Sequence, residues 1–234
     1  LIFFMLNTTI VLYAVETFKA SPSIGGLVSG AFIIGTLVSR LFIGNLINAK
    51  NSKKILLIGL ILFTLGTSLY FIKRGITFLI LTRFLHGITS GISSTVIGAI
   101  IAIIIPKSRK GEGVSYFSLS TALATALGPF IGLSLSQNAG FKTIFVFCLI
   151  VSIVTCVISL FFNNSKLIIS ESKNSKKEFR ISNFIEIKAL PISLIMFISS
   201  LCFSSVLSYI NLFAIDNHLE STANLFFIVY AIAV

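Results

Sequence analysis

The stretch ITFLILTRFLHGITSGISSTVIGAIIAII at residues 76–104 decides the class of fold. It contains one basic side chain of the Lys or Arg type, Arg83, and no Asp or Glu. An α-helix needs about 20 predominantly apolar residues to cross the hydrocarbon core of a bilayer. Because this stretch exceeds that length, we predict that it spans a membrane.

The residues on either side have the same character. The chain of 234 residues is 56% apolar and 11% charged, and its mean hydropathy is +1.04. A soluble domain carries about 25% charged residues, so a soluble fold is excluded. We predict an all-α, polytopic membrane protein. The other predicted spans are residues 1–18, 24–44, 55–72, 113–135, 141–162 and 189–213, with an eighth beginning near residue 224.

Apolar residues reach both ends of the chain, at Leu1 and Val234. A spanning helix cannot end in mid-bilayer with unpaired carbonyls, so we expect a piece of a longer protein. The polar stretch at 163–188 separates the sixth and seventh spans and ends in a pattern typical of a helix on the membrane face. We predict a six-helix half at 1–162 with a truncated first span, a cytoplasmic central loop at 163–188, and the truncated start of a second half at 189–234.

Basic residues are concentrated in alternate loops. The net charge is +11, and 12 of the 18 Lys and Arg residues follow the second, fourth and sixth predicted spans. Because positive loops favour the cytoplasm, we predict a cytoplasmic N-terminus and contact with anionic lipids, and no nucleic acid partner. The twelve basic residues after the second, fourth and sixth spans are Lys50, Lys53, Lys54, Lys107, Arg109, Lys110, Lys166, Lys173, Lys176, Lys177, Arg180 and Lys188. The loops on the other side contain four, Lys19, Lys73, Arg74 and Lys142.

A short internal repeat relates the first and seventh predicted spans. A shift of 200 residues aligns LYAVE at 12–16 with LFAID at 212–216, each at the end of an apolar run. Spans one and seven are therefore equivalent and run in the same direction. Two parallel six-helix halves joined by a cytoplasmic loop are typical of a transporter.

Three stretches resemble the motifs of one transporter family. They are GNLINAKNSKK at 44–54, RFLHGITSG at 83–91 and ATALGPFIGL at 124–133. They are similar to the G-x-L-a-D-r-x-G-r-K-K, R-x-x-q-G-x-g-x-G and g-x-x-x-G-P-x-x-G-G motifs of the major facilitator superfamily, and specifically of its drug–proton antiporter branch. The resemblance covers the whole chain and implies a twelve-span helical bundle, of which about seven or eight spans are present.

In that family the first of these loops is a conformational latch between the halves. Gly44 and the closing pair Lys53 and Lys54 match the motif, whereas Asn48 stands where an acid is expected. Asn48 can cap a helix start but carries no charge, so the resemblance implies a weaker latch. The alternative is an ordinary basic cytoplasmic loop.

The second motif places Arg83 inside a predicted span. An arginine there is costly and normally faces a bundle interior or a wet cavity, and the resemblance links it with proton coupling. The alternative is that Arg83 reaches the outer headgroups. His86, where Gln is usual, is a candidate proton carrier or a polar contact between helices. Gly87 and Gly91 lie on one helix face and permit close helix packing.

The third motif resembles the signature of antiporters. Pro129 removes a backbone hydrogen bond and predicts a kink, while Ala124, Gly128 and Gly132 allow a neighbouring helix to approach. In the family this signature accompanies exporters and is largely absent from symporters.

Few acids are available to bind a coupling proton. None lies in mid-membrane in the first six predicted spans, and Glu16 and Asp216 form an equivalent pair near the outer ends of spans one and seven. Both are candidates for proton exchange in a central cavity, and the alternative is an interfacial acid in water. The main proton-binding acid is also expected in the spans that this sequence lacks.

The sequence as a whole predicts a secondary transporter that exports small, amphipathic or drug-like molecules by proton antiport. A proton-coupled nutrient symporter and a non-functional remnant of an interrupted gene are the alternatives. We expect the complete protein to be a monomer in a bacterial plasma membrane, driven by the proton gradient. We expect no cofactor, no metal and no enzymatic activity: the only histidines, His86 and His218, lie on different spans, and Cys148, Cys156 and Cys202 have no paired spacing.

Overall fold

The computed structural model describes residues 1–47, 51–162, 190–217, 219, 225–226 and 229. Within these residues every regular element is a helix, which confirms the prediction of an all-α protein. The α-helices are α1 (Ile2–Phe18), α2 (Pro22–Leu46), α3 (Ser52–Ser68), α4 (Ile76–Ile104), α5 (Lys110–Ala139), α6 (Phe141–Leu160) and α8 (Leu190–Asp216). The 3-10 turns η1 (Leu69–Phe71) and η2 (Lys107–Arg109) precede α4 and α5.

Six of the described helices are long and apolar enough to cross a membrane, and α1 is a shorter apolar helix of 17 residues. The largest difference from the predicted spans is in α5, which exceeds 113–135 at both ends. Its first turn contains Glu112, which forms a bidentate ion pair with Arg109. Hydropathy alone misses such a charged turn. The predicted central loop at 163–188 and most of the eighth span lie outside the described residues.

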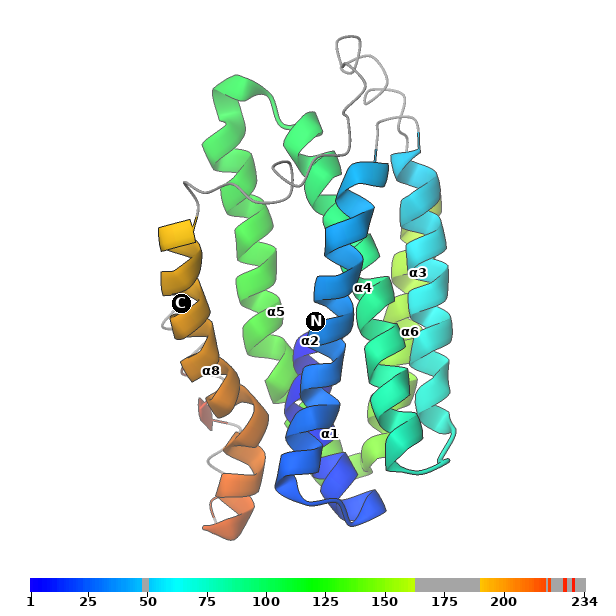
Figure 1. The fold of residues 1–234 in the computed structure, drawn as a ribbon, viewed down its shortest axis with the longest axis vertical. Coiled ribbons are helices and arrows are strands. Elements are labelled where there is room, and N and C mark those ends of the chain that lie inside the picture. Colours follow the sequence, from blue (N-terminus) through cyan, green and yellow to red (C-terminus); the bar gives the residue numbers. More distant parts are fainter. Residues whose placement is uncertain (48–50, 163–189, 218, 220–224, 227–228, 230–234) are drawn as a thin grey trace.

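The helices run alternately up and down the long axis (Figure 1). We call the end with the α1–α2, α3–α4 and α5–α6 connections the lower end, and the end with the α2–α3 and α4–α5 connections the upper end. Helix α2 packs on α4, α3 packs on α4 and α6, and α1 packs on α2, α5 and α8. The main apolar core lies between α1, α3, α4 and α6 and includes Met5, Tyr13, Leu79 and Phe145.

Glycines bring α2 and α4 into close contact. A Cβ at Gly87 would overlap the backbone carbonyl oxygen of Phe32, and one at Gly35 would overlap that of Phe84. The two positions lie on facing helices, so each backbone sits against the other. Membrane helices associate in this way because packing replaces the hydrophobic effect inside lipid.

Two further glycines allow α5 to approach α1. A Cβ at Gly128 would lie 2.8 Å from Cβ of Phe4, and one at Gly132 would lie 3.0 Å from the carbonyl oxygen of Met5. Pro129 lies between these positions, buried, and α5 continues through it. The glycines of the third motif thus face a neighbouring helix in the same half.

We predict that Gly87→Ala lowers the free energy of unfolding of the complete protein by about 1–3 kcal/mol, because the new methyl group pushes α2 and α4 apart. Gly98→Ala is the matched control: it lies in the same helix with no atom within 4 Å of its added Cβ. Thermal unfolding in detergent measures both variants. Equal melting temperatures for the two would contradict the predicted contact.

Candidate functional site

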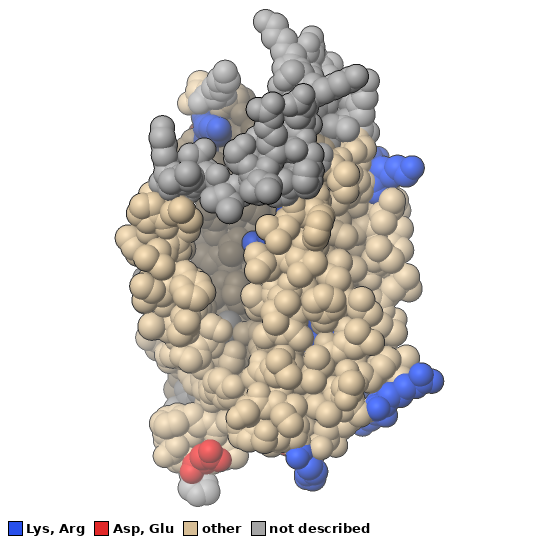
Figure 2. All heavy atoms as spheres, in the orientation of Figure 1, with Lys and Arg blue, Asp and Glu red and all other residues tan. Residues whose placement is uncertain are grey.

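A cavity of about 570 Å³ lies between α1, α2 and α8. Figure 2 shows the surface hollowed between α8 and α2. None of the described residues that line the cavity is charged. The polar ones include Asn7, Ser29, Ser200, Ser204, Ser205, Ser208 and Tyr209, and the aromatic ones Phe3, Phe4, Phe197 and Phe203.

The cavity is closed below and widens above. A Cβ at Gly26 would overlap the Tyr209 hydroxyl, so the Tyr209 side chain reaches from α8 to α2 near the lower ends of both helices. Ala214 of α8 and Leu133 of α5 form a small buried cluster there. In contrast, residues 190–200 at the upper end of α8 are all exposed. The three helices therefore converge at the lower end only.

A stripe of serines lines the α8 side. Ser200, Ser204 and Ser208 are spaced four residues apart and so lie on one helix face. Across the cavity, the Ser29 hydroxyl donates a hydrogen bond to the side-chain oxygen of Asn7. Sequence analysis missed these residues, although the four-residue spacing in an apolar helix was a detectable signal.

Arg83 lies directly behind the cavity wall and is fully buried. Its guanidinium carbon lies 4.7 Å from the centre of the Phe32 ring, within the range of a cation–π interaction. The Phe32 ring stacks in turn on that of Phe3, which lines the cavity, with centroids 5.1 Å apart. Arg83 Nε donates to the carbonyl oxygen of Val28 at 3.4 Å. Two stacked rings, Phe32 and then Phe3, therefore separate the cation from the cavity.

A chain of hydrogen bonds leads from Arg83 to α3. Arg83 Nη1 donates to the Tyr70 hydroxyl at 3.5 Å, the hydroxyl lies 3.2 Å from His86 Nδ1, and His86 Nε2 lies 3.0 Å from the Thr67 hydroxyl. The Thr67 hydroxyl donates its only proton to the carbonyl of Phe63, at 2.9 Å. Thr67 must therefore accept from His86 Nε2, and in a neutral imidazole Nδ1 then accepts from Tyr70.

A neutral His86 in this arrangement carries its proton on Nε2. Each hydrogen bond in this series is then donated in the same direction, from Arg83 towards the backbone of α3. Arg83 Nη2 and the Thr82 hydroxyl are buried and have no hydrogen-bond partner among the described residues. No carboxylate in the described part of the chain pairs with Arg83. The cation is thus held by dipoles and an aromatic ring, so its position depends on their geometry.

The structure brings Arg83 and His86 together but leaves the two candidate acids apart from them. Arg83 points into the bundle, not along the membrane surface, and His86 joins α4 to α3. Glu16 and Asp216 are exposed at the lower ends of α1 and α8 and do not line the cavity. Tyr70 and Thr67, which complete the hydrogen-bond chain, were not singled out from sequence.

The predicted latch residues lie at the upper end. Lys53 donates to the carbonyl oxygen of Leu160 at 3.0 Å, at the C-terminus of α6, where a cation is favourable. This contact joins two helices of the first six. Gly44 and Lys54 are exposed, and Asn48 lies outside the described residues.

The remaining motif positions are helix contacts. Gly91 faces α2, where an added Cβ would lie 2.7 Å from the carbonyl oxygen of Thr36, and Ala124 is half-buried on α5. The described residues contain no group of three or more His, Cys, Asp or Glu side chains that could hold a metal ion.

Comparison with known proteins agrees with this architecture. The chain is 28% identical over 198 residues to an uncharacterized MFS-type transporter of Methanocaldococcus jannaschii, which covers 82% of this chain and 51% of the relative. It is 24% identical to multidrug resistance protein 2 of Bacillus subtilis over 166 residues, 71% of this chain and 41% of the relative. It is 30% identical to quinolone resistance protein NorA of Staphylococcus aureus over 107 residues, 46% of this chain and 28% of that protein.

The chain thus spans about half the length of the first two relatives or less. The sequence profile of the Major Facilitator Superfamily matches residues 1–234, the whole of the chain. The helices and the family match identify a multi-pass membrane protein, and the chain belongs to the Major Facilitator Superfamily.

Proposed function

We propose that the complete protein exports small amphipathic molecules in exchange for protons, by alternating access of two six-helix halves. The observation that carries this proposal is the position of Arg83, a buried cation separated from the cavity by two stacked rings. Charges inside spanning helices are costly and typically mark ion pathways and proton relays. Relatives named for multidrug and quinolone resistance support export of drug-like compounds.

The cavity lining supports the substrate class. Rings such as Phe3 and Phe203 offer flat apolar contact, and the hydroxyls of Ser200 and Ser204 offer hydrogen bonds. Without a charged group among its described residues, this wall selects by shape and polarity. Such a lining suits a molecule with a large apolar body and a few polar groups.

The shape of the cavity supports loading from the cytoplasm. The concentration of basic residues in the upper-end loops favours a cytoplasmic upper end, and α8 is exposed at that end. At the lower end, the Tyr209 hydroxyl lies against Gly26. These features support our proposal of an inward-facing carrier in a bacterial plasma membrane, with a cytoplasmic N-terminus. In this proposal the protein is a monomeric carrier and not an enzyme. It needs no cofactor, and the proton gradient drives it.

Coupling in this proposal passes through the stacked rings. A substrate that displaces Phe3 also moves Phe32, and with it one face of the Arg83 site. Arg83 then shifts its bonds with Val28 and Tyr70, which hold α4 to α2 and to the end of α3. Among the described residues, Glu16 and Asp216 are the acids that we propose to exchange protons. They lie on α1 and α8, which pack together.

We predict that Arg83→Ala abolishes proton-driven export while membrane insertion is retained. The complete reading frame would be expressed in efflux-deficient cells preloaded with a lipophilic cationic dye, and dye loss followed with and without a protonophore. Arg40→Ala is the matched control, because Arg40 also lies within a span but is exposed and bonds only Ser94 among the described residues.

The expected result is protonophore-sensitive dye loss in the original protein and in Arg40→Ala, and at least a tenfold slower loss in Arg83→Ala. Unchanged protonophore-sensitive loss in Arg83→Ala would remove this residue from the mechanism. Uptake of the dye in place of its loss would instead support a symporter, and no difference from empty vector would support an inactive gene product.

We also predict that His86→Gln retains most export, whereas His86→Leu loses it. A Gln side chain keeps one donor and one acceptor for Thr67 and Tyr70. Leu removes one hydrogen-bond partner from each of these two buried hydroxyls, which then keep only the Phe63 carbonyl and Arg83. The pH dependence of dye loss separates the two roles of His86. If His86→Gln abolishes that dependence, His86 carries a proton itself and is more than a polar contact.

A further inference from the structure

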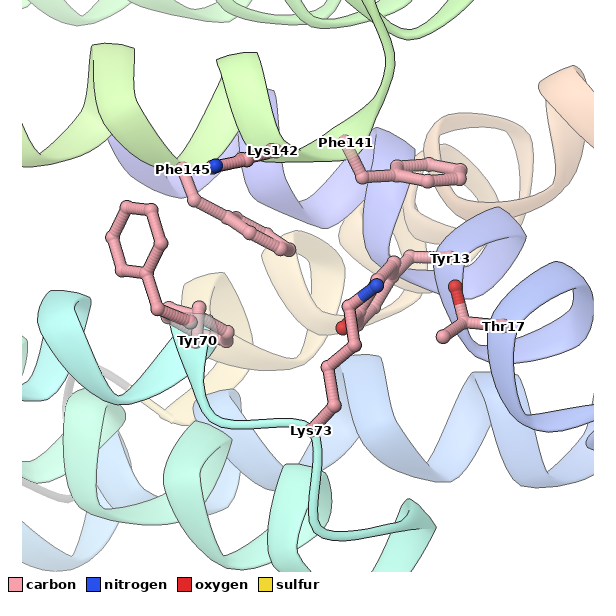
Figure 3. Close-up of a pocket in the computed structure, with 8 residues that line it drawn as sticks. Tyr13, Thr17, Tyr70, Lys73, Phe141, Lys142 and Phe145 are labelled. Carbon is pink, nitrogen blue, oxygen red and sulfur yellow. The ribbon is translucent and has the colours of Figure 1, made fainter.

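A second cavity lies at the lower end, away from the proposed transport site. Its volume is about 400 Å³, and α1, the turn after α3 and the start of α6 form its walls. The rings of Tyr13, Tyr70, Phe71, Phe141 and Phe145, the hydroxyl-bearing Thr17, and Lys73 and Lys142 line it. Figure 3 shows Lys73 extending towards Tyr13, with Lys142 and Phe145 on the facing helix.

The aromatic walls of this pocket are packed against one another. The rings of Tyr13 and Phe145 meet edge to face with centroids 5.1 Å apart, and Tyr13 meets Phe141 at the same distance. Tyr70 stacks on Phe145 with centroids 5.3 Å apart. Each ring is therefore supported by another, so the pocket is preformed and offers flat apolar faces to a ligand.

Lys73 and Lys142 have no compensating charge among the residues that the structure describes. Both are exposed, and no hydrogen bond or ion pair joins either ammonium group to a described residue. No Asp or Glu is among the described lining residues, and Glu16, next to Thr17 on α1, points to solvent and does not line the pocket. Two positive charges from separate elements at one pocket repel each other, and a bound anion would relieve that repulsion.

The distribution of charge along the sequence makes this pairing informative. The lower-end loops hold only four basic residues, Lys19, Lys73, Arg74 and Lys142, because positive charge is concentrated at the other end. Two of these four line the same aromatic pocket. The orientation of the protein in the membrane accounts for the shortage of lysines here but not for the presence of two of them at one pocket.

We propose that this pocket binds an amphipathic anion, with its carboxylate or phosphate group between Lys73 and Lys142 and its apolar part against the rings. The Thr17 hydroxyl is a further donor for the anionic group. An anionic lipid and a soluble aromatic carboxylate both have this chemistry. The inference does not rest on the proposed export function, because none of the pocket residues except Tyr70 belongs to the Arg83 site.

Fluorescence quenching in the purified complete protein tests the proposal. The sequence contains no Trp, so Phe71→Trp places a reporter in the pocket wall, read as the difference from the protein without it. The quenchers are phosphatidylglycerol with brominated chains and 4-iodobenzoate, both anionic. Brominated phosphatidylcholine and 4-iodobenzamide, which have no net charge, are the matched controls.

We expect saturable quenching by an anionic quencher and at least tenfold weaker binding after Lys73→Gln with Lys142→Gln. Lys19→Gln with Arg74→Gln removes the same net charge from the same end, outside the pocket, and should change the affinity less than threefold. Melting temperatures in the same detergent establish that both double variants are folded. Quenching by phosphatidylglycerol alone identifies a lipid site, and quenching by iodobenzoate identifies a site for soluble anions.

Equal weakening in the two double variants would overturn the proposal, because it would reveal a diffuse effect of net charge. Equal quenching by charged and uncharged quenchers would overturn it too. Tyr70→Phe separates this site from transport: it retains the ring that lines the pocket and removes the hydroxyl that Arg83 needs. Anion binding is expected to survive that change whatever happens to export.

Discussion

The buried guanidinium of Arg83 constrains the arrangement of the helices around it. Lipid offers no partner to a cation inside a bundle, so the protein must supply every compensating group. These groups come from different parts of the chain: the Val28 carbonyl and the Phe32 ring from α2, and the Tyr70 hydroxyl from the turn after α3. A change in the position of α2 or α3 relative to α4 alters these contacts directly.

Phe32 contributes both to the packing of α2 on α4 and to the stabilisation of the Arg83 charge. Its backbone carbonyl lies against Gly87 of α4, and its side chain lies beneath the guanidinium of Arg83. Since both contacts depend on the same approach of α2 to α4, they form together. The stacking of Phe32 on Phe3 then extends this arrangement to the cavity wall. Phe32 and Phe3 thus connect the buried guanidinium of Arg83, by direct ring contacts, to the cavity where a substrate would lie.

Hydropathy predicted the helices well because lipid imposes length and apolarity on each span. It failed at the start of α5, where Arg109 and Glu112 form an ion pair in a charged turn that a hydropathy scale counts as loop. Arg83 and His86 stood out in the sequence because polar residues are rare in spans. Tyr70 and Thr67 did not stand out, since a Tyr or Thr near a span end is common and only folding brings them to His86.

The sequence by itself determined the type and order of the described helices, the family, and the isolated basic residue, Arg83, inside an apolar span. These properties follow from local composition and short motifs, which need no partner from elsewhere in the chain. Only the tertiary structure decided which groups compensate Arg83, which serines of α8 face the cavity, and that Lys73 and Lys142 share one pocket. The physical reason is that each of these depends on the rotation and approach of separate helices, which side-chain packing sets over the whole bundle.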